Sequence, residues 1–187
     1  KTNQYLMDED ENNIALMDKI EAGDLQGVRE LLKKGVSPNA ADENGYTALI
    51  KSIVADKLEI TKALLKAGAN VNSPPFTHTA VRAATLYGRV EFLQELIRRG
   101  ADLSCPSAHG RTALMGCALP RKDVDRIRTR ACARLILADP RGKASINAMN
   151  DYQENALVLC RNTSKLIGVP VDRTLEFLLL AHGAIMP

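Results

Sequence analysis

The chain has 187 residues, of which 45% are hydrophobic and 25% are charged. This is the composition of an ordinary soluble domain and excludes an intrinsically disordered chain. The formal net charge of +3 is too small to indicate nucleic acid or membrane by itself. Aromatic residues make up only 4%, with no Trp, which leaves few rings for a sugar groove or a base-stacking platform. No apolar run approaches the roughly 20 residues of a membrane span.

The cysteines bear on the cellular compartment, and the first residues bear on whether the chain is part of a longer protein. The four cysteines form no Cys-x-x-Cys pair, and their density is below that of a secreted scaffold. We therefore expect free thiols in a reducing compartment, the cytoplasm or the nucleus. The chain begins with Lys1-Thr2-Asn3 and without a signal peptide, and we expect it to be a piece of a longer protein.

The sequence repeats itself with a period of 32 to 33 residues. When Thr47 is placed over Thr79, Gly68 coincides with Gly100, 32 positions later, and Gly35 lies 33 positions before Gly68. Further units begin at Thr112 and near Asn155, which makes five units. Such a period is typical of an array of stacked supersecondary units.

Each unit predicts a pair of helices. A short apolar stretch of about two turns leads to a glycine such as Gly88, and a second stretch carries paired aliphatic residues such as Leu64-Leu65. The glycine that follows the second stretch provides the left-handed cap that ends a helix. Neither helix can bury its apolar face alone, so neighbouring units have to stack.

This pattern resembles the ankyrin repeat over nearly the whole chain. The matching residues are Thr47, Leu49, Gly68, Ala69, Val71, Asn72, Thr79, Ala84, Gly88, Gly100, Ala101, Thr112, Leu114 and Ala118. The sequence departs from the family's Thr-Pro-Leu-His motif in two ways. Alanine replaces the proline (Ala48, Ala80, Ala113, Ala156), and the histidine is replaced by Ile50, Arg82, Met115 and Val158.

The resemblance implies an all-α solenoid of stacked helix pairs with short β-hairpin-like turns. We expect one domain with units at about 10–41, 42–74, 75–106, 107–149 and 150–187. It further implies a non-enzymatic protein–protein interaction module, a scaffold or regulatory domain that captures a partner segment on its concave face. In that family the turn tips and the inner helices form this face, which assigns to it Tyr46, Lys51, Phe76, His78, Tyr87, His109, Arg111 and Tyr152.

The last two units are longer than the others. Gly100 and Gly183 are 83 positions apart, 17 more than two units of 33 residues. Register places seven extra residues between the helices of each unit, and three more in the turn at 139–143. We expect the first insertion to continue a helix, because Val124, Ile127 and Leu135 keep helical spacing. We expect the second, at 162–169, to be a loop with Pro170 in the first turn of the following helix.

The first insertion is basic, and basic residues recur every four positions. Residues 121–143 have a local net charge of +5, whereas residues 1–30 have one of −5. The recurring residues are Lys122, Arg126, Arg130 and Arg134. They are either a solvated helix face or a site for an acidic or phosphorylated segment of a protein, because arginine binds anions in a bidentate manner. Nucleic acid or another phosphate-rich ligand is an alternative that the lack of interleaved aromatic residues disfavours.

No motif for catalysis, metal or cofactor is present, so we expect neither an enzyme nor a cofactor. The three histidines have no acidic partner at motif spacing, and there is no glycine-rich phosphate loop. We interpret Cys117 and Cys160 as small buried residues at equivalent positions, and His182 as a residue that favours the end of the last helix.

The last helix has the sequence of an interior helix. Residues 175–180 read Leu-Glu-Phe-Leu-Leu-Leu, whereas a terminal repeat normally has a polar outer face. This predicts that the last helix packs against an adjacent domain or subunit, an architectural alternative to partner capture.

Overall fold

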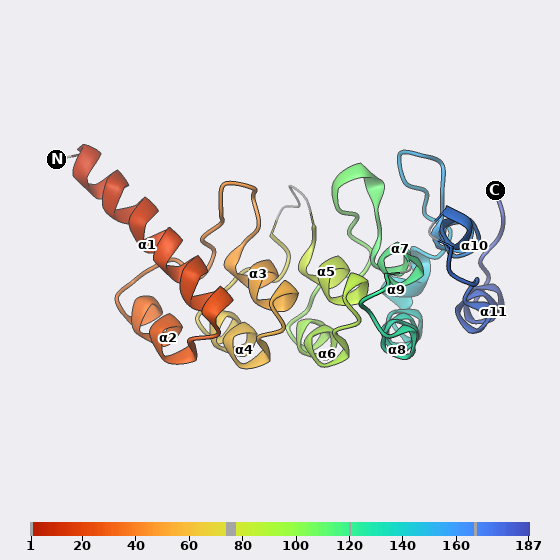
Figure 1. The fold of residues 1–187 in the computed structure, drawn as a ribbon, viewed down its shortest axis with the longest axis horizontal. Coiled ribbons are helices and arrows are strands. Elements are labelled where there is room, and N and C mark those ends of the chain that lie inside the picture. Colours follow the sequence, from red (N-terminus) through yellow and green to blue (C-terminus); the bar gives the residue numbers. More distant parts are fainter. Residues whose placement is uncertain (1, 74–77, 120, 167) are drawn as a thin grey trace. The chain divides into compact units, whose positions relative to one another are not determined.

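The computed structural model describes residues 2–73, 78–119, 121–166 and 168–187 (Figure 1). Within these ranges the regular secondary structure is helical, and the β-type pairing consists of two isolated antiparallel bridges, Ala41–Thr47 and Ser107–Arg111. The expected all-α array of helix pairs joined by hairpin-like turns is confirmed. Among the described residues, no helix is long and apolar enough to cross a membrane. The chain divides into two compact units, residues 1–80 and 81–187.

Unit 1 contains two helix pairs. The first is α1 (Thr2–Ala22) with α2 (Leu25–Lys33), and the second is α3 (Ala48–Val54) with α4 (Leu58–Lys66). Helix α1 packs on α2 and α3, and α2 packs on α4. Helix α1 begins at Thr2, well before residue 10, near which the first sequence repeat is predicted to start.

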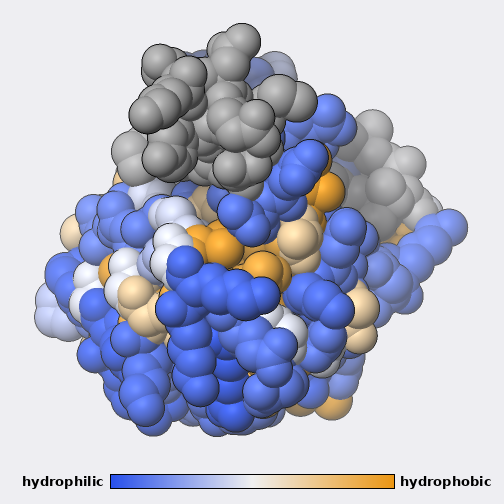
Figure 2. Space-filling view, turned by 90° about the vertical axis from the view of Figure 1, so that its left-hand side faces the viewer, coloured by the Kyte–Doolittle hydropathy of each residue, from blue (hydrophilic) through white to orange (hydrophobic). Residues whose placement is uncertain are grey.

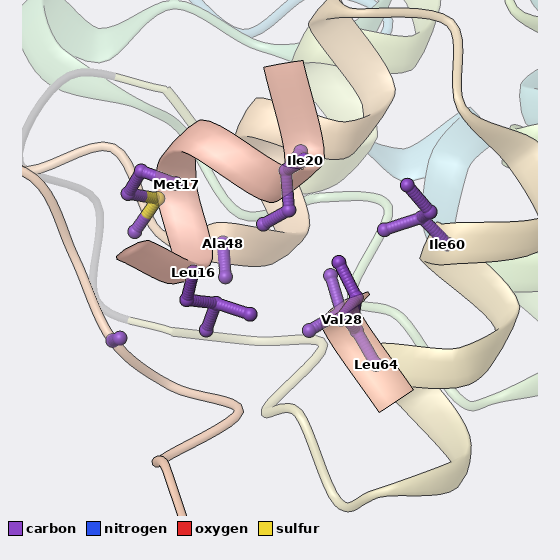
Figure 3. Packing of buried hydrophobic residues seen from close by; sticks show 8 residues of the cluster. Leu16, Met17, Ile20, Val28, Ala48, Ile60 and Leu64 are labelled. Carbon is purple, nitrogen blue, oxygen red and sulfur yellow. The ribbon is translucent and has the colours of Figure 1, made fainter. Parts of the chain in front are cut away.

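The core of unit 1 is aliphatic. Figure 3 shows side chains from all four helices turned toward one another. Among them Leu16, Ile20, Val28 and Leu64 have no solvent-accessible surface. These residues come from both helix pairs, so the stacking of neighbouring pairs buries the apolar faces that a single pair leaves open.

Local interactions begin and end the helices where the sequence predicts. The Thr47 hydroxyl accepts a hydrogen bond from the Ile50 amide (3.3 Å), and Thr112 does the same for Met115 (3.4 Å). Each bond satisfies an amide that the first helical turn leaves without a partner. Gly68 and Gly100 follow the ends of α4 and α6 with positive φ angles of 94° and 79°. They adopt the left-handed conformation that glycine allows at low cost.

Unit 2 contains the remaining helices. The bounds are α5 (Ala80–Leu86, beginning at the boundary between the units), α6 (Val90–Arg98), α7 (Ala113–Ala118), α8 (Arg126–Ala138), α9 (Pro140–Ala144), α10 (Ala156–Leu166) and α11 (Arg173–Ala181). Helix α8 packs on α6, α7, α9 and α11, and α10 packs on α7 and α11. His182 caps α11, and its Nδ1 lies 2.8 Å from the Leu178 carbonyl oxygen, as its predicted structural role requires.

Both insertions differ from their predicted form. The first does not simply continue a helix: it widens the connection between α7 and α8, and Asp125 caps a helix that begins only at Arg126. The second is not a loop throughout, because α10 extends to Leu166. Pro170 lies before α11 rather than in its first turn, since Asp172 is the cap of that helix. The turn predicted at 139–143 contains α9, whose first residue is Pro140. Helical spacing alone did not reveal the capping aspartates, which decide where α8 and α11 begin.

Candidate interaction surfaces

The tips of two turns in unit 2 meet in a polar and aromatic cluster formed by His109, Arg111, Asp151 and Tyr152. The His109 and Tyr152 rings lie 6.1 Å apart, and the Arg111 guanidinium lies 5.9 Å from the centre of the Tyr152 ring. His109 Nδ1 is 3.5 Å from a carboxylate oxygen of Asp151. Three residues that the sequence assigned separately to the binding face thus come together. Tyr152 keeps 60% of its surface exposed within this cluster.

Hydrogen bonds donated by backbone amides hold the two turn tips in place. The Ser107 amide donates to the Arg111 carbonyl oxygen (2.8 Å), which closes the first turn. The Asn150 side-chain oxygen accepts hydrogen bonds from the amides of Tyr152 and Glu154 (2.9 Å each), which closes the second. The Asp151 amide then donates to the His109 carbonyl oxygen across the tips (3.1 Å). The cluster is therefore preorganised, which lowers the entropy cost of binding.

The predicted residues of unit 1 also gather near a turn. The rings of Tyr46 and His78 lie 5.7 Å apart. Lys51 forms ion pairs with Glu21 (2.6 Å) and Asp42 (3.5 Å), and the hydrogen bond that it donates to Glu21 raises the Lys51 pKa above its usual value. Phe76 lies outside the described residues.

A groove with a volume of about 630 Å³ lies between α1 and the turn at 41–47. Lys51 is among its lining residues, as are four carboxylates, Asp10, Asp18, Asp42 and Glu43. The groove is therefore acidic, although the sequence assigned only its lysine to the binding face. The strongly acidic composition of residues 1–30 was the signal for this surface. Figure 2 looks onto this end of the chain and shows a mainly hydrophilic surface with a small central hydrophobic area.

Tyr87 contacts a cation that the sequence did not single out. The Arg121 guanidinium lies 4.7 Å from the centre of the Tyr87 ring and forms a hydrogen-bonded ion pair with Asp123 (2.8 Å). The hydrogen bond to Asp123 raises the pKa of Arg121 and lowers that of Asp123. Part of the Tyr87 ring is thus covered from within the chain.

The basic residues around α8 fall into two groups. Arg126 donates to the Pro170 carbonyl oxygen (2.8 Å), and Arg130 forms a bidentate ion pair with Asp172 (2.9 Å), so both hold the segment that leads into α11. Lys122 and Arg134 are exposed. Figure 1 also places α8 on the side of unit 2 opposite the turn tips, so the two predicted surfaces are separate.

The sequence of this chain is similar to a known repeat family and to several known proteins. The family described as "Ankyrin repeats (3 copies)" matches residues 2–75. The chain is 31% identical over 119 residues, 63% of its length, to the B-cell lymphoma 3 protein homolog of Mus musculus. It is 35% identical over 116 residues, 59% of its length, to SH3 and multiple ankyrin repeat domains protein 2 of Homo sapiens. It is 33% identical over 81 residues, 43% of its length, to inversin of Danio rerio.

Residues 2–75 thus match the ankyrin repeat family, and the chain is similar to part of each of these relatives. The matched region spans 26%, 6% and 8% of these three relatives, respectively.

The helices of unit 2 bury three of the four free cysteines, Cys117, Cys132 and Cys160. Burial raises the pKa of Cys132 to about 12 and that of Cys160 to about 11, and it raises the Cys117 pKa as well. Cys117 and Cys160 line the same small cavity of about 20 Å³, which agrees with their equivalent positions in neighbouring sequence repeats. Cys105 is only partly buried. Among the described residues, no three of the types His, Cys, Asp and Glu lie close enough to hold a metal ion.

We expect one of the four thiols to react rapidly with a disulfide reagent such as DTNB at about pH 8, because only a thiolate is nucleophilic. Partial burial raises the pKa of Cys105 as well, but Cys105 is partly exposed, whereas the other three thiols are buried, so it is the thiol that the reagent reaches. The absorbance change should correspond to one thiol in the native chain and to four in denaturant. A Cys105→Ser variant that keeps a fast-reacting thiol would contradict this assignment.

Proposed function

We propose that this ankyrin module captures an extended segment of a partner protein on the surface formed by its turn tips and inner helices, the face that the family makes concave. It acts as a non-enzymatic scaffold or regulatory domain, and its free thiols suit the cytoplasm or the nucleus. The residues we assign to this surface are Tyr46, Lys51, Phe76, His78, Tyr87, His109, Arg111 and Tyr152.

The tip cluster of unit 2 is the observation that supports this proposal most strongly. Tyr152 is a large amphipathic side chain that is 60% exposed, although the turns beneath it are fixed by hydrogen bonds. Arg111 and His109 surround it with hydrogen-bond donors. Tyrosine and arginine on a rigid backbone are the residues that most often dominate binding energy at protein interfaces.

A separate contribution from α8 is part of the proposal. Lys122 and Arg134 are exposed and are the residues of the basic stripe available to an acidic or phosphorylated segment. The guanidinium groups of Arg126 and Arg130 are half-buried and bind Pro170 and Asp172, so we assign them the role of positioning α11. Reversing Lys122 and Arg134 to Glu therefore tests charge selectivity without breaking an internal ion pair.

We expect Tyr152→Ala to weaken partner binding by at least about tenfold, because an aromatic anchor contributes roughly 2 kcal/mol or more. Partners are first captured from lysate with the wild-type chain, and their affinity for each variant is then measured in solution. The matched control is Phe177→Ala, which removes an exposed ring from a different surface. Unchanged affinity for Tyr152→Ala would contradict the proposal, provided that the variant melts like the wild type.

A specific observation favours architectural packing as a second candidate function. The C-terminal end of the chain exposes Phe177 by 73%, Leu180 by 45%, Ile185 by 62% and Met186 by 48%. Exposed apolar patches commonly mark an interaction surface. In this second proposal α11 packs against an adjacent domain or subunit, and the control variant Phe177→Ala would then lose binding while Tyr152→Ala would not.

A further inference from the structure

The outer helices of unit 1 form a second groove, on a surface that the proposed function does not use. Helices α2 and α4 lie side by side (Figure 1), and the groove along them has a volume of about 370 Å³. Four cations line it, Arg29 and Lys33 from α2 and Lys62 and Lys66 from α4. Its apolar lining comes from Leu32, Ala63 and Ala67.

The groove carries an excess of positive charge. Its one acidic lining residue, Glu59, pairs with Lys62 (2.7 Å). In the part of the chain that the structure describes, this is the one ion pair formed by the four cations. Arg29, Lys33 and Lys66 are exposed to solvent. An anion that enters the groove therefore meets cations from both sides.

The arrangement of the cations is regular in two directions. On each helix the two cations are four positions apart and so lie on the same face. Between the helices, Arg29 corresponds to Lys62 and Lys33 to Lys66, each 33 positions later, which is the distance from Gly35 to Gly68. Like charges at this helical spacing repel each other and destabilise a helix. The arrangement thus costs stability in the free chain, a cost that a bound anionic partner offsets.

We propose that this groove binds an acidic amphipathic helix of a partner protein. The apolar residues between the cations fit the apolar face of a helix, and Asp or Glu residues one turn apart on that helix match the four-residue spacing of the cations. Charge complementarity selects an acidic partner and steers its approach. Nucleic acid fits less well, because no aromatic side chain lines the groove to stack on a base.

The test uses the full 187-residue chain and fluorescein-labelled synthetic peptides of about 16 residues, long enough for four helical turns. One peptide combines a Leu stripe with flanking Glu residues, and a second has the same Leu stripe with Lys in place of Glu. A short DNA duplex is the third probe. Binding is measured by fluorescence anisotropy at low and high salt.

We expect the Glu–Leu peptide to bind and the Lys–Leu peptide not to bind. The double variant Arg29→Glu/Lys66→Glu should weaken binding of the Glu–Leu peptide by about tenfold or more, since each reversed contact replaces attraction by repulsion. The matched control Lys34→Glu/Lys143→Glu makes the same change in net charge outside the groove and should leave the affinity within about twofold. Ala67→Gln, which partly fills the groove without changing its charge, should also weaken binding.

Four results would overturn the proposal. They are no binding of the Glu–Leu peptide, equal binding of the Lys–Leu peptide, an equal loss in the control variant, and tighter binding of DNA that the groove variant abolishes. The last result would assign the groove to nucleic acid. Thermal melts of both double variants establish that they are folded. Tyr152→Ala should not change binding of the Glu–Leu peptide, so the outcome is independent of the turn-tip surface.

Discussion

Replacing Asp172 by Ala should lower the free energy of unfolding by about 3 kcal/mol, because one carboxylate has two structural roles. It caps α11 by accepting a hydrogen bond from the Leu175 amide (3.0 Å). It also accepts two hydrogen bonds from Arg130, which joins α11 to α8. The Asp172 side chain is only 11% exposed, so water replaces these bonds poorly and the variant leaves Arg130 half-buried without its partner.

One further variant separates the two roles of Asp172, and a second variant is the control. Asp172→Asn keeps a good helix cap and removes the charge, so it should lose less stability than Asp172→Ala. Asp123→Ala is the matched control, because it breaks an Asp–Arg pair whose carboxylate is 64% exposed and should cost about 1 kcal/mol or less. Urea unfolding followed by circular dichroism gives the three values. Equal losses for Asp172→Ala and Asp123→Ala would show that the link between α8 and α11 adds no stability.

Replacing Leu64 by Ala should cost about 2–5 kcal/mol of unfolding free energy, the range observed when a fully buried leucine is truncated. Leu64 lies on α4 in the core of unit 1, among residues of α1, α2 and α3 (Figure 3). The methyl groups it loses leave a cavity that the surrounding helices fill only in part.

Leu180→Ala is the control for this variant. Leu180 is 45% exposed on α11, so the same truncation should cost less than about 1 kcal/mol. Urea unfolding of both variants measures the difference. Neighbouring helix pairs of a repeat array unfold together only when the interface between them is strong. Leu64 lies at such an interface, so its truncation should also make the urea unfolding transition broader or divide it into two steps. A loss below about 1 kcal/mol for Leu64→Ala would contradict the packing described for unit 1.

The position of the basic residues shows what helical spacing alone does not predict. The helical spacing of the basic residues at 122–134 predicts one common surface, yet Arg126 and Arg130 bind groups more than forty positions later in the chain. The repeat register, by contrast, contained the signal for the groove between α2 and α4. Arg29 and Lys33 occupy the same repeat positions as Lys62 and Lys66, which predicts that they line up on neighbouring outer helices.

The sequence by itself determined the repeat period, the all-α fold and the positions at which most helices begin and end. These features depend on interactions within a few residues, such as the hydroxyl of Thr47 and the glycine at position 68. Only the tertiary structure decided which side chains are available to a partner. A long charged side chain pairs with a group that is close to it in space, wherever that group lies in the sequence. For Arg130 this group is the carboxylate of Asp172, 42 positions away in the chain. Tyr152 and His109 likewise meet only because the two turns pack together.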